Sequence, residues 1–246
     1  MDLNSFKNAK MLSDRMTALR NRVLLANLEL VEYGLVCLTW GNASEIDREL
    51  GIIAIKPSGV PYDKMTADNI VFVDTDGRQV EDGMKPSSDL ATHIELYRSF
   101  PDIGGVVHTH STYATAFAQA RRDIPTLGTT HADTFLCNIP CTRDMKSDEI
   151  ASEYEKNTGK VIAECFATNN IDPNTTPAVL VASHGVFSWG ENAGGAVQNA
   201  LIAERVAELA YFSLSLPQGN TAKISDSLLE RHFFRKHGKN ATYGQV

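Results

Sequence analysis

The order of apolar runs and helical patterns along the chain constrains its fold most. Short apolar runs bounded by turn residues, at Ile52–Ile55 and Ile70–Val73, indicate strands of an antiparallel hairpin region. Further buried strands are expected at Gly104–His110 and Ala178–Ala182, and helices are interspersed without a strict strand–helix alternation. This order predicts an α/β fold in which a sheet is flanked by helices, rather than a barrel.

Helical spacing of apolar residues predicts the helices of this fold. One helix is expected over residues 13–33, with Ser13 as its cap and Gly34 as its stop. Others are expected over residues 88–99, 112–120, 148–168, 193–216 and 225–237. The 246 residues contain no internal repeat and no low-complexity linker, which indicates one domain.

Charge and cysteine content exclude several classes of protein. Lys and Arg number 23 against 30 Asp and Glu, a net charge of −7, which argues against binding to nucleic acid or to an anionic membrane surface. Four irregularly spaced cysteines indicate buried thiols in a reducing compartment. The polar N-terminus is not a signal peptide, and the longest uncharged apolar stretch, Pro177–Gly190, is too short to span a membrane. We therefore expect a cytoplasmic protein.

Histidines at the ends of two predicted strands are the most informative residues for function. His108 and His110 alternate on one strand, so their side chains share a face with Cα atoms ~7 Å apart and can converge on one ion. The apolar run Ala178–Ser183 also ends in a histidine, His184. Three histidines with one open position are typical of a catalytic rather than a structural metal site.

Other polar clusters have two readings when each is taken alone. Asp89 is either a carboxylate favoured at a helix start or part of a site, and residues 128–133 are either a solvated loop or a second polar cluster. Lys56–Gly59 is either an ordinary turn or a phosphate cradle of backbone N–H groups and an ammonium. The basic segment 231–238 and Tyr243 are either a charged helix end with a frayed tail or functional residues.

Taken together and in order, these segments resemble the class II aldolase/epimerase family. The motifs are Leu38-Thr39-Trp40-Gly41-Asn42, Ile55-Lys56-Pro57-Ser58-Gly59, Lys85-Pro86-Ser87-Ser88-Asp89, His108-Thr109-His110, Gly128-Thr129-Thr130-His131-Ala132-Asp133, Ser183-His184-Gly185 and Arg235-Lys236-His237-Gly238. The resemblance implies a single α/β/α domain over residues 20–246 with a central, mainly antiparallel sheet, preceded by an N-terminal extension over residues 1–19. It also implies a homotetramer with active sites at the subunit interfaces.

The resemblance further implies roles for particular residues. A divalent metal, zinc by default with Mn²⁺ or Co²⁺ as alternatives, would be held by Asp89, His108, His110 and His184. The phosphate of a sugar phosphate would be bound at Ser58, Gly59, Ser87 and Ser88. Further substrate contacts are implied at Asn42, Lys56, Thr129, His232 and Arg235. Asp133 and Tyr243 match the acid/base pair, with Tyr243 donated by a neighbouring subunit.

The implied activity is the interconversion of L-ribulose 5-phosphate and D-xylulose 5-phosphate by C3–C4 cleavage, rotation of the aldehyde and re-addition. The alternative within the family is a sugar-phosphate aldolase, such as one acting on L-fuculose phosphate, for which we expect Glu rather than Asp at position 89. A non-enzymatic relative such as the adducin head would be expected to lack the metal ligands, and all are present here. Thr134 departs from the family pattern, in which we expect an aromatic residue after the catalytic Asp.

Overall fold

The central layer of the computed structural model is a six-stranded sheet in which all neighbouring strands pair antiparallel, as predicted. Its strands, in the order β3-β2-β1-β4-β6-β5 across the sheet, are β1 (Asn42–Asp47), β2 (Ile52–Ile55), β3 (Val71–Asp74), β4 (Gly105–Thr109), β5 (Ala178–Leu180) and β6 (Val186–Gly190). The structure describes residues 3–217, 221–237 and 241–242. The hydrophobic pattern predicts four of these strands and misses β1 and β6.

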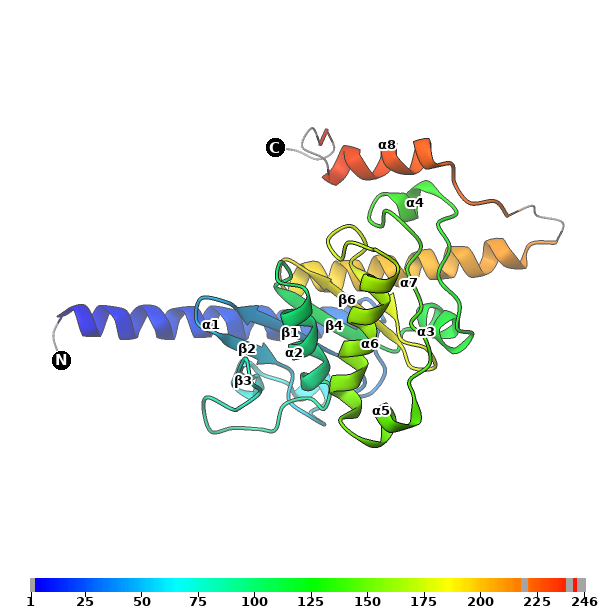
Figure 1. The fold of residues 1–246 in the computed structure, drawn as a ribbon. Coiled ribbons are helices and arrows are strands. Elements are labelled where there is room, and N and C mark those ends of the chain that lie inside the picture. Colours follow the sequence, from blue (N-terminus) through cyan, green and yellow to red (C-terminus); the bar gives the residue numbers. More distant parts are fainter. Residues whose placement is uncertain (1–2, 218–220, 238–240, 243–246) are drawn as a thin grey trace.

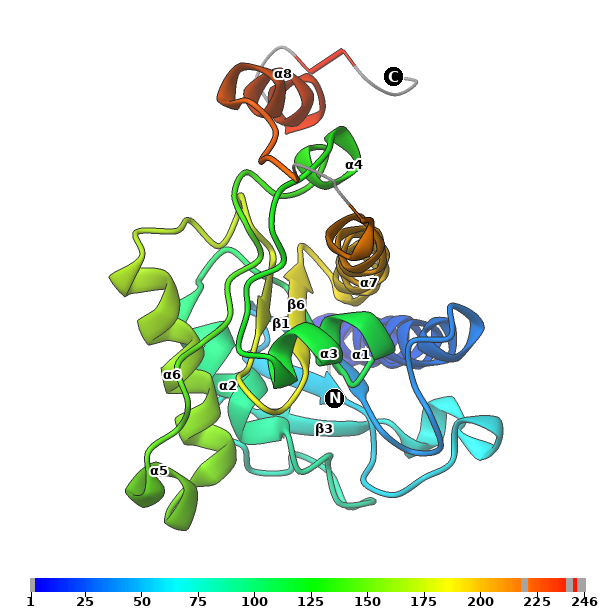
Figure 2. The same cartoon turned by 90° about the vertical axis from the view of Figure 1, so that its right-hand side faces the viewer.

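Helices cover both faces of this sheet. The described helices are α1 (Leu3–Glu32), α2 (Leu90–Ser99), α3 (Thr112–Gln119), α4 (Thr129–Ala132), α5 (Ser147–Ala151), α6 (Tyr154–Thr168), α7 (Ala193–Ser215) and α8 (Asp226–His237), with 3-10 turns at Tyr62–Lys64 and Ala67–Asn69. The apolar residues of α2 and α6 form one core with the sheet, and those of α1 and α7 form another on the opposite face (Figures 1 and 2). The α/β/α layering is therefore confirmed.

The first helix is longer than predicted. It begins at Leu3 rather than near Ser13, so Ser13 lies inside α1 and does not cap it. The helix ends as expected: Gly34 has φ of +67°, and the N–H of Leu35 donates to the carbonyl of Leu30 at 2.9 Å. One helix thus spans both the expected extension and the start of the expected domain.

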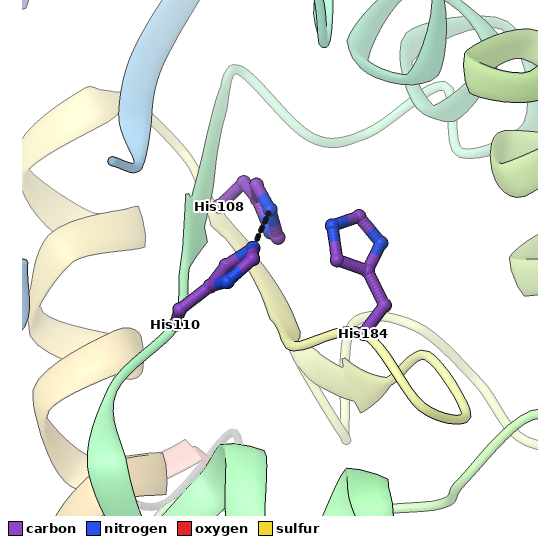
Figure 3. A group of neighbouring side chains, drawn as sticks. All are labelled: His108, His110 and His184. Carbon is purple, nitrogen blue, oxygen red and sulfur yellow. Dashed lines mark hydrogen bonds between the residues drawn. The ribbon is translucent and has the colours of Figure 1, made fainter. Parts of the chain in front are cut away.

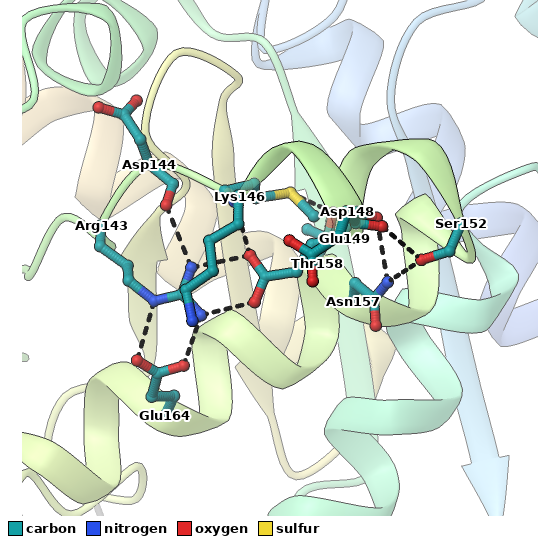
Figure 4. A network of polar contacts seen from close by, with 10 residues as sticks. Arg143, Asp144, Lys146, Asp148, Glu149, Ser152, Asn157, Thr158 and Glu164 are labelled. Atoms are coloured by element: carbon teal, nitrogen blue, oxygen red, sulfur yellow. Dashed lines mark hydrogen bonds and ion pairs between the residues drawn. The ribbon is translucent and has the colours of Figure 1, made fainter.

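The single helix predicted over residues 148–168 is two helices. The backbone leaves the helical region at Ser152 (φ −107°, ψ −119°), between α5 and α6. Arg143 binds both pieces, because its guanidinium donates to Glu149 of α5 at 2.8 Å and to Glu164 of α6 at 2.7 and 2.9 Å (Figure 4). This network holds α5 against α6. At the start of α6, the ring of Tyr154 lies 6.3 Å from that of His184.

The C-terminal helix lies outside the three layers. α8 packs against the short helix α4, away from the sheet (Figure 2). Of its described side chains, Phe233 is the buried one. Residues 128–133, which could be a solvated loop by sequence alone, contain α4. No described helix combines the length and apolar character needed to cross a membrane.

Candidate metal site and active-site cavity

Three histidines converge at one end of the sheet (Figure 3). His108 lies on β4, His110 follows the last residue of that strand, and His184 lies in the turn between β5 and β6. Each offers a ring nitrogen, and these nitrogens all lie within 4.8 Å of one another. The ring centroids are 4.7–5.0 Å apart. The chain therefore brings together the three histidines that the sequence singled out.

The turn that carries His184 fits closely against β4. Ser183 has a left-handed backbone with φ of +62°, which turns the chain directly after the apolar run. A Cβ atom on Gly185 would lie 2.6 Å from the carbonyl oxygen of Thr109 and 3.1 Å from the ring of His110. Because glycine has no Cβ, the turn approaches the end of β4 closely enough for His184 to join the other two rings.

The protonation of the cluster suits a metal ion. Burial lowers the pKa of His108 to about 3, and it also lowers the pKa values of His110 and His184. His108 Nδ1 lies 3.0 Å from the carbonyl of Val186, so it carries the hydrogen and leaves a lone pair on Nε2. That Nε2 lies 3.1 Å from His110 Nε2, and His184 Nδ1 is buried without a partner among the described residues. Neutral imidazoles whose ring nitrogens converge are what a divalent cation requires.

Asp89 adds a carboxylate to the same cavity. It precedes α2, and its Oδ2 accepts a hydrogen bond of 2.6 Å from Asn42 Nδ2. Burial alone would raise the pKa of Asp89, but His108, His93 and the Asn42 amide outweigh it, so the pKa lies below its ordinary value. The carboxyl is therefore ionised at neutral pH. Three imidazoles and one carboxylate fit Zn²⁺, Mn²⁺ or Co²⁺.

Every residue predicted for the metal and the phosphate lines one cavity of about 390 Å³. Its lining comprises Thr39, Trp40, Gly41, Asn42, Lys56, Pro57, Ser58, Gly59, Ser87, Ser88, Asp89, His108, His110 and His184. These residues come from segments before β1, after β2, before α2, after β4 and after β5. A polar cavity of this size with one cationic and one anionic side chain suits a small phosphorylated molecule.

Part of the expected phosphate cradle is already occupied. The N–H of Ser58 donates to Lys85, and the N–H of Ser87 donates to the carbonyl of Lys56, both at 2.9 Å. Among the described residues, the Gly59 N–H and the Ser58 hydroxyl donate no hydrogen bond. These groups, rather than the first two N–H groups, are free to bind an anion.

Lys56 supplies the positive charge of the cavity. Its side chain is 2% exposed, and Nζ donates to the carbonyls of Pro57 and Val60 at 3.3 and 3.2 Å. Nζ also lies 4.9 Å from the centre of the Tyr62 ring. Burial lowers the pKa of Lys56, and the charge of Asp89 acts in the opposite direction.

Asp133, one of the two expected acid/base groups, does not line this cavity. Asp133, at the end of α4, contacts α8 instead: its carboxylate lies 2.9 Å from His232 Nδ1 and Arg235 and 3.2 Å from Lys236 Nζ. Burial acts to raise the pKa of Asp133, but these three groups lower it overall, which makes the carboxylate a weak base in this arrangement. Thr129 lies nearby in α4. Tyr243 is outside the described residues.

Two residues near the site carry no role in the sequence prediction. Trp40, 55% exposed, lies at the cavity with its ring 6.3 Å from that of His110. His93 is fully buried one helical turn after Asp89. The Asp89-x-x-x-His93 spacing was the available signal for the second, since residues four apart share one face of a helix.

This fold and this cavity define a known class. The chain matches the family described as "Class II Aldolase and Adducin N-terminal domain" over residues 21–211, and it belongs to that family. The adducin alternative predicts loss of the metal ligands, whereas the three histidines here are present and converge.

Two curated proteins and one solved structure are similar to this chain over most of its length. The chain is 53% identical over 231 residues to "L-ribulose-5-phosphate 4-epimerase UlaF" of Salmonella paratyphi C (strain RKS4594), which covers 94% of this chain and 100% of that protein. The identity and coverage are the same for the protein of that name from Salmonella choleraesuis (strain SC-B67). Among solved structures, an L-fuculose 1-phosphate aldolase superposes with a TM-score of 0.73 at 26% identity, covering 87% of this chain and 94% of that one.

Proposed function

We propose that the protein is a metal-dependent L-ribulose-5-phosphate 4-epimerase that interconverts L-ribulose 5-phosphate and D-xylulose 5-phosphate. The 53% identity to proteins of that name over nearly the whole chain carries this proposal. The aldolase alternative rests on a relative that shares only 26% of its sequence with this chain, and position 89 is Asp here. The ligands proposed for the metal, zinc by default, are Asp89, His108, His110 and His184.

The substrate dictates the kind of reaction. Carbon 4 carries no acidic proton because the carbonyl is at carbon 2, so simple deprotonation cannot invert it. Cleavage of the C3–C4 bond leaves its electrons beside the carbonyl, and re-addition to the other face of the aldehyde inverts carbon 4. A divalent ion bound at the histidine cluster supplies Lewis-acid stabilisation of that negative charge.

Residues of the chain bind the phosphate and orient the metal ligands. We assign the phosphate to the segments Ser58–Gly59 and Ser87–Ser88, with Lys56 offsetting its charge; this tether keeps the aldehyde fragment in the cavity while it rotates. Asn42 orients the Asp89 carboxylate through the 2.6 Å hydrogen bond.

The C4 hydroxyl points in opposite directions before and after inversion, so two proton carriers on opposite faces are needed. We assign these roles to Asp133 and Tyr243, and we assign Thr129, His232 and Arg235 to the same part of the substrate site. Because Asp133 lies outside the cavity and is held by α8, this assignment requires a second subunit to complete each site and α8 to release the carboxylate.

We accordingly propose a cytoplasmic homotetramer with active sites between subunits. The end of α7 supports an interface, since Leu209, Tyr211, Phe212 and Leu216 are each at least half exposed and the two aromatic rings lie 5.5 Å apart. Apolar clusters of this kind on a surface mark interaction sites.

The test is to incubate Zn²⁺-loaded protein with L-ribulose 5-phosphate and to follow D-xylulose 5-phosphate and free glycolaldehyde phosphate. We expect the first product without accumulation of the aldehyde. Net release of glycolaldehyde phosphate would support the aldolase instead, and no turnover of this substrate would contradict the proposal. Light scattering of the same preparation tests the tetramer.

A further inference from the structure

A fully buried histidine lies beside the proposed metal site without any role in the proposed reaction. His93 is in α2, one helical turn after Asp89, and its exposed fraction is 0%. Burial lowers its pKa to about 4, so the ring is neutral at pH 7 and carries one hydrogen, on either Nδ1 or Nε2. The neighbouring hydroxyl groups determine which nitrogen holds it.

Two hydroxyls place that hydrogen on Nε2. Ser44 Oγ lies 2.7 Å from His93 Nδ1 and 2.8 Å from the hydroxyl of Tyr97, which is itself buried. Among the described side chains, Ser44 is the hydrogen-bond partner of the Tyr97 hydroxyl, so Tyr97 donates its hydrogen to Ser44. Ser44 then donates its own hydrogen to Nδ1, which must be the unprotonated nitrogen.

This leaves a buried donor beside an anion. His93 Nε2 has no hydrogen-bond partner among the described residues, although buried N–H groups almost always have one. Asp89 lies four residues earlier on the same side of α2, and its charge acts on His93. One of its carboxylate oxygens is held by Asn42, whereas the other accepts no hydrogen bond from the described residues. An unsatisfied donor and an unsatisfied acceptor therefore share one turn of helix.

His93 is not itself placed to be a metal ligand. The ring of Phe187 stacks on His108 with centroids 4.1 Å apart and lies 6.2 Å edge-on from His93. His93 is also absent from the group of converging ligand nitrogens. Any effect of His93 on the site must pass through a neighbour.

We infer that His93 is a positioning residue for Asp89: its Nε2–H is the donor available to orient the carboxylate oxygen that Asn42 does not hold. This role rests on the proposed metal site, because Asp89 matters only if it is a ligand. Groups that orient metal ligands contribute about 10- to 100-fold to metal affinity.

Two amide substitutions of His93 test the roles of its two ring nitrogens separately. In His93→Gln the side-chain amide reaches the position of Nε2 and can still donate toward Asp89, whereas in His93→Asn it reaches only the position of Nδ1 beside Ser44. Titration with Co²⁺, followed by its visible absorption, should show affinity lowered about 10- to 100-fold and an altered spectrum for His93→Asn. His93→Gln should stay near the wild type.

The outcomes are distinct. If the wild type binds Co²⁺ and both variants bind it with equal affinity, the role of His93 is wrong but the metal site is not contradicted. A wild-type protein that binds no Co²⁺ would overturn the metal site and this role together. If neither variant folds, ¹⁵N-histidine NMR of the metal-free wild type decides: the inference expects the His93 hydrogen on Nε2, and a hydrogen on Nδ1 contradicts it.

Discussion

At the scale of single residues, the candidate metal site depends on which nitrogen of each ring is free. The carbonyl of Val186 takes the hydrogen of His108 Nδ1, and burial keeps all three rings neutral. The Nε2 lone pair of His108 is thus turned toward the other two rings before any ion binds, and the neighbouring Asp89 is ionised. Little rearrangement is needed for binding, which favours affinity.

We expect His184→Ala to remove most of the bound metal and nearly all activity while the fold survives. The ring lies in a turn rather than within the sheet, so its loss leaves the strand pairing intact. Metal analysis and circular dichroism of the purified variant measure the two effects. His237→Ala, which changes an exposed histidine in α8, is the control and should keep its metal. Full metal occupancy in His184→Ala would contradict the ligand assignment.

The sequence could predict His108, His110 and His184 because each follows an apolar run that must be buried, which fixes where the side chain emerges. The Asp89-x-x-x-His93 spacing places His93 on the same side of a helix as Asp89, but it could not predict that His93 is buried, because a histidine inside a helix has the same local pattern whether it is buried or exposed. The separation of Asp133 from the cavity was equally invisible, since it follows from where α8 packs and not from any local motif.

At the scale of elements, β1 shows why hydrophobic pattern fails for a central strand. Its sequence is polar, yet Glu45 and Asp47 are buried. Glu45 accepts from Arg22 at 2.7 Å and from the N–H of Ala193, the first residue of α7, at 3.0 Å; Arg15 binds Asp47. Arginines from α1 and a backbone N–H of α7 replace the apolar contacts that a strand of this kind usually makes. Those partners are distant in sequence, so no short window contains the signal.

A second buried carboxylate holds the start of α3, the helix that follows His110. Glu204 of α7 accepts hydrogen bonds of 2.9 Å from the N–H groups of Tyr113 and Ala114. We expect Glu204→Ala to lower the free energy of unfolding by about 1–3 kcal/mol, because one buried and one partly buried N–H group lose their acceptor. Urea denaturation measures this. Glu208→Ala, one turn further along α7, removes a surface ion pair with Arg205 and a hydrogen bond with the Tyr113 side chain but leaves both N–H groups of α3 paired, and it should cost less than about 1 kcal/mol. Equal losses in the two variants would contradict the capping role.

At the scale of the whole molecule, buried neutral histidines make stability depend on pH. Burial lowers the pKa of His131 to about 4, and its Nε2 donates to the carbonyl of Cys137 at 2.8 Å. The folded pKa is below the unfolded value of about 6.5, so its contribution is complete above pH 6.5 and is lost as pH falls toward 4. This histidine should reduce stability by up to about 1.4 kcal/mol per pH unit in that window.

The variant His131→Gln keeps a donor toward Cys137 but does not titrate. We expect its unfolding free energy, measured in urea from pH 7 to pH 4, to fall less steeply than that of the wild type. His237→Gln changes an exposed histidine and should keep the wild-type slope. An unchanged slope in His131→Gln would show that this ring is protonated at no cost in the folded protein.

Shared active sites make a prediction about mixtures of inactive subunits. Tyr243→Phe should lower epimerisation about 10²–10⁴-fold by removing one proton carrier, with metal content unchanged. Suppose that each site combines the metal cavity of one subunit with the tail of another. Co-refolding this variant with an equal amount of His184→Ala should then restore about a quarter of the wild-type activity. The reason is that random assembly pairs an intact cavity with an intact tail at about a quarter of the sites. Mixtures as inactive as their parents would place both groups in one subunit.

Gly185 has a consequence for engineering this protein. The residue does not line the cavity, yet the carbonyl of Thr109 occupies the space its side chain would need. In a library randomised across residues 183–186 and selected for turnover, we expect Gly185 to be recovered as strictly as His184. A mutational scan would then mark Gly185 as essential for catalysis. The true reason would be the close approach of its backbone to that of Thr109.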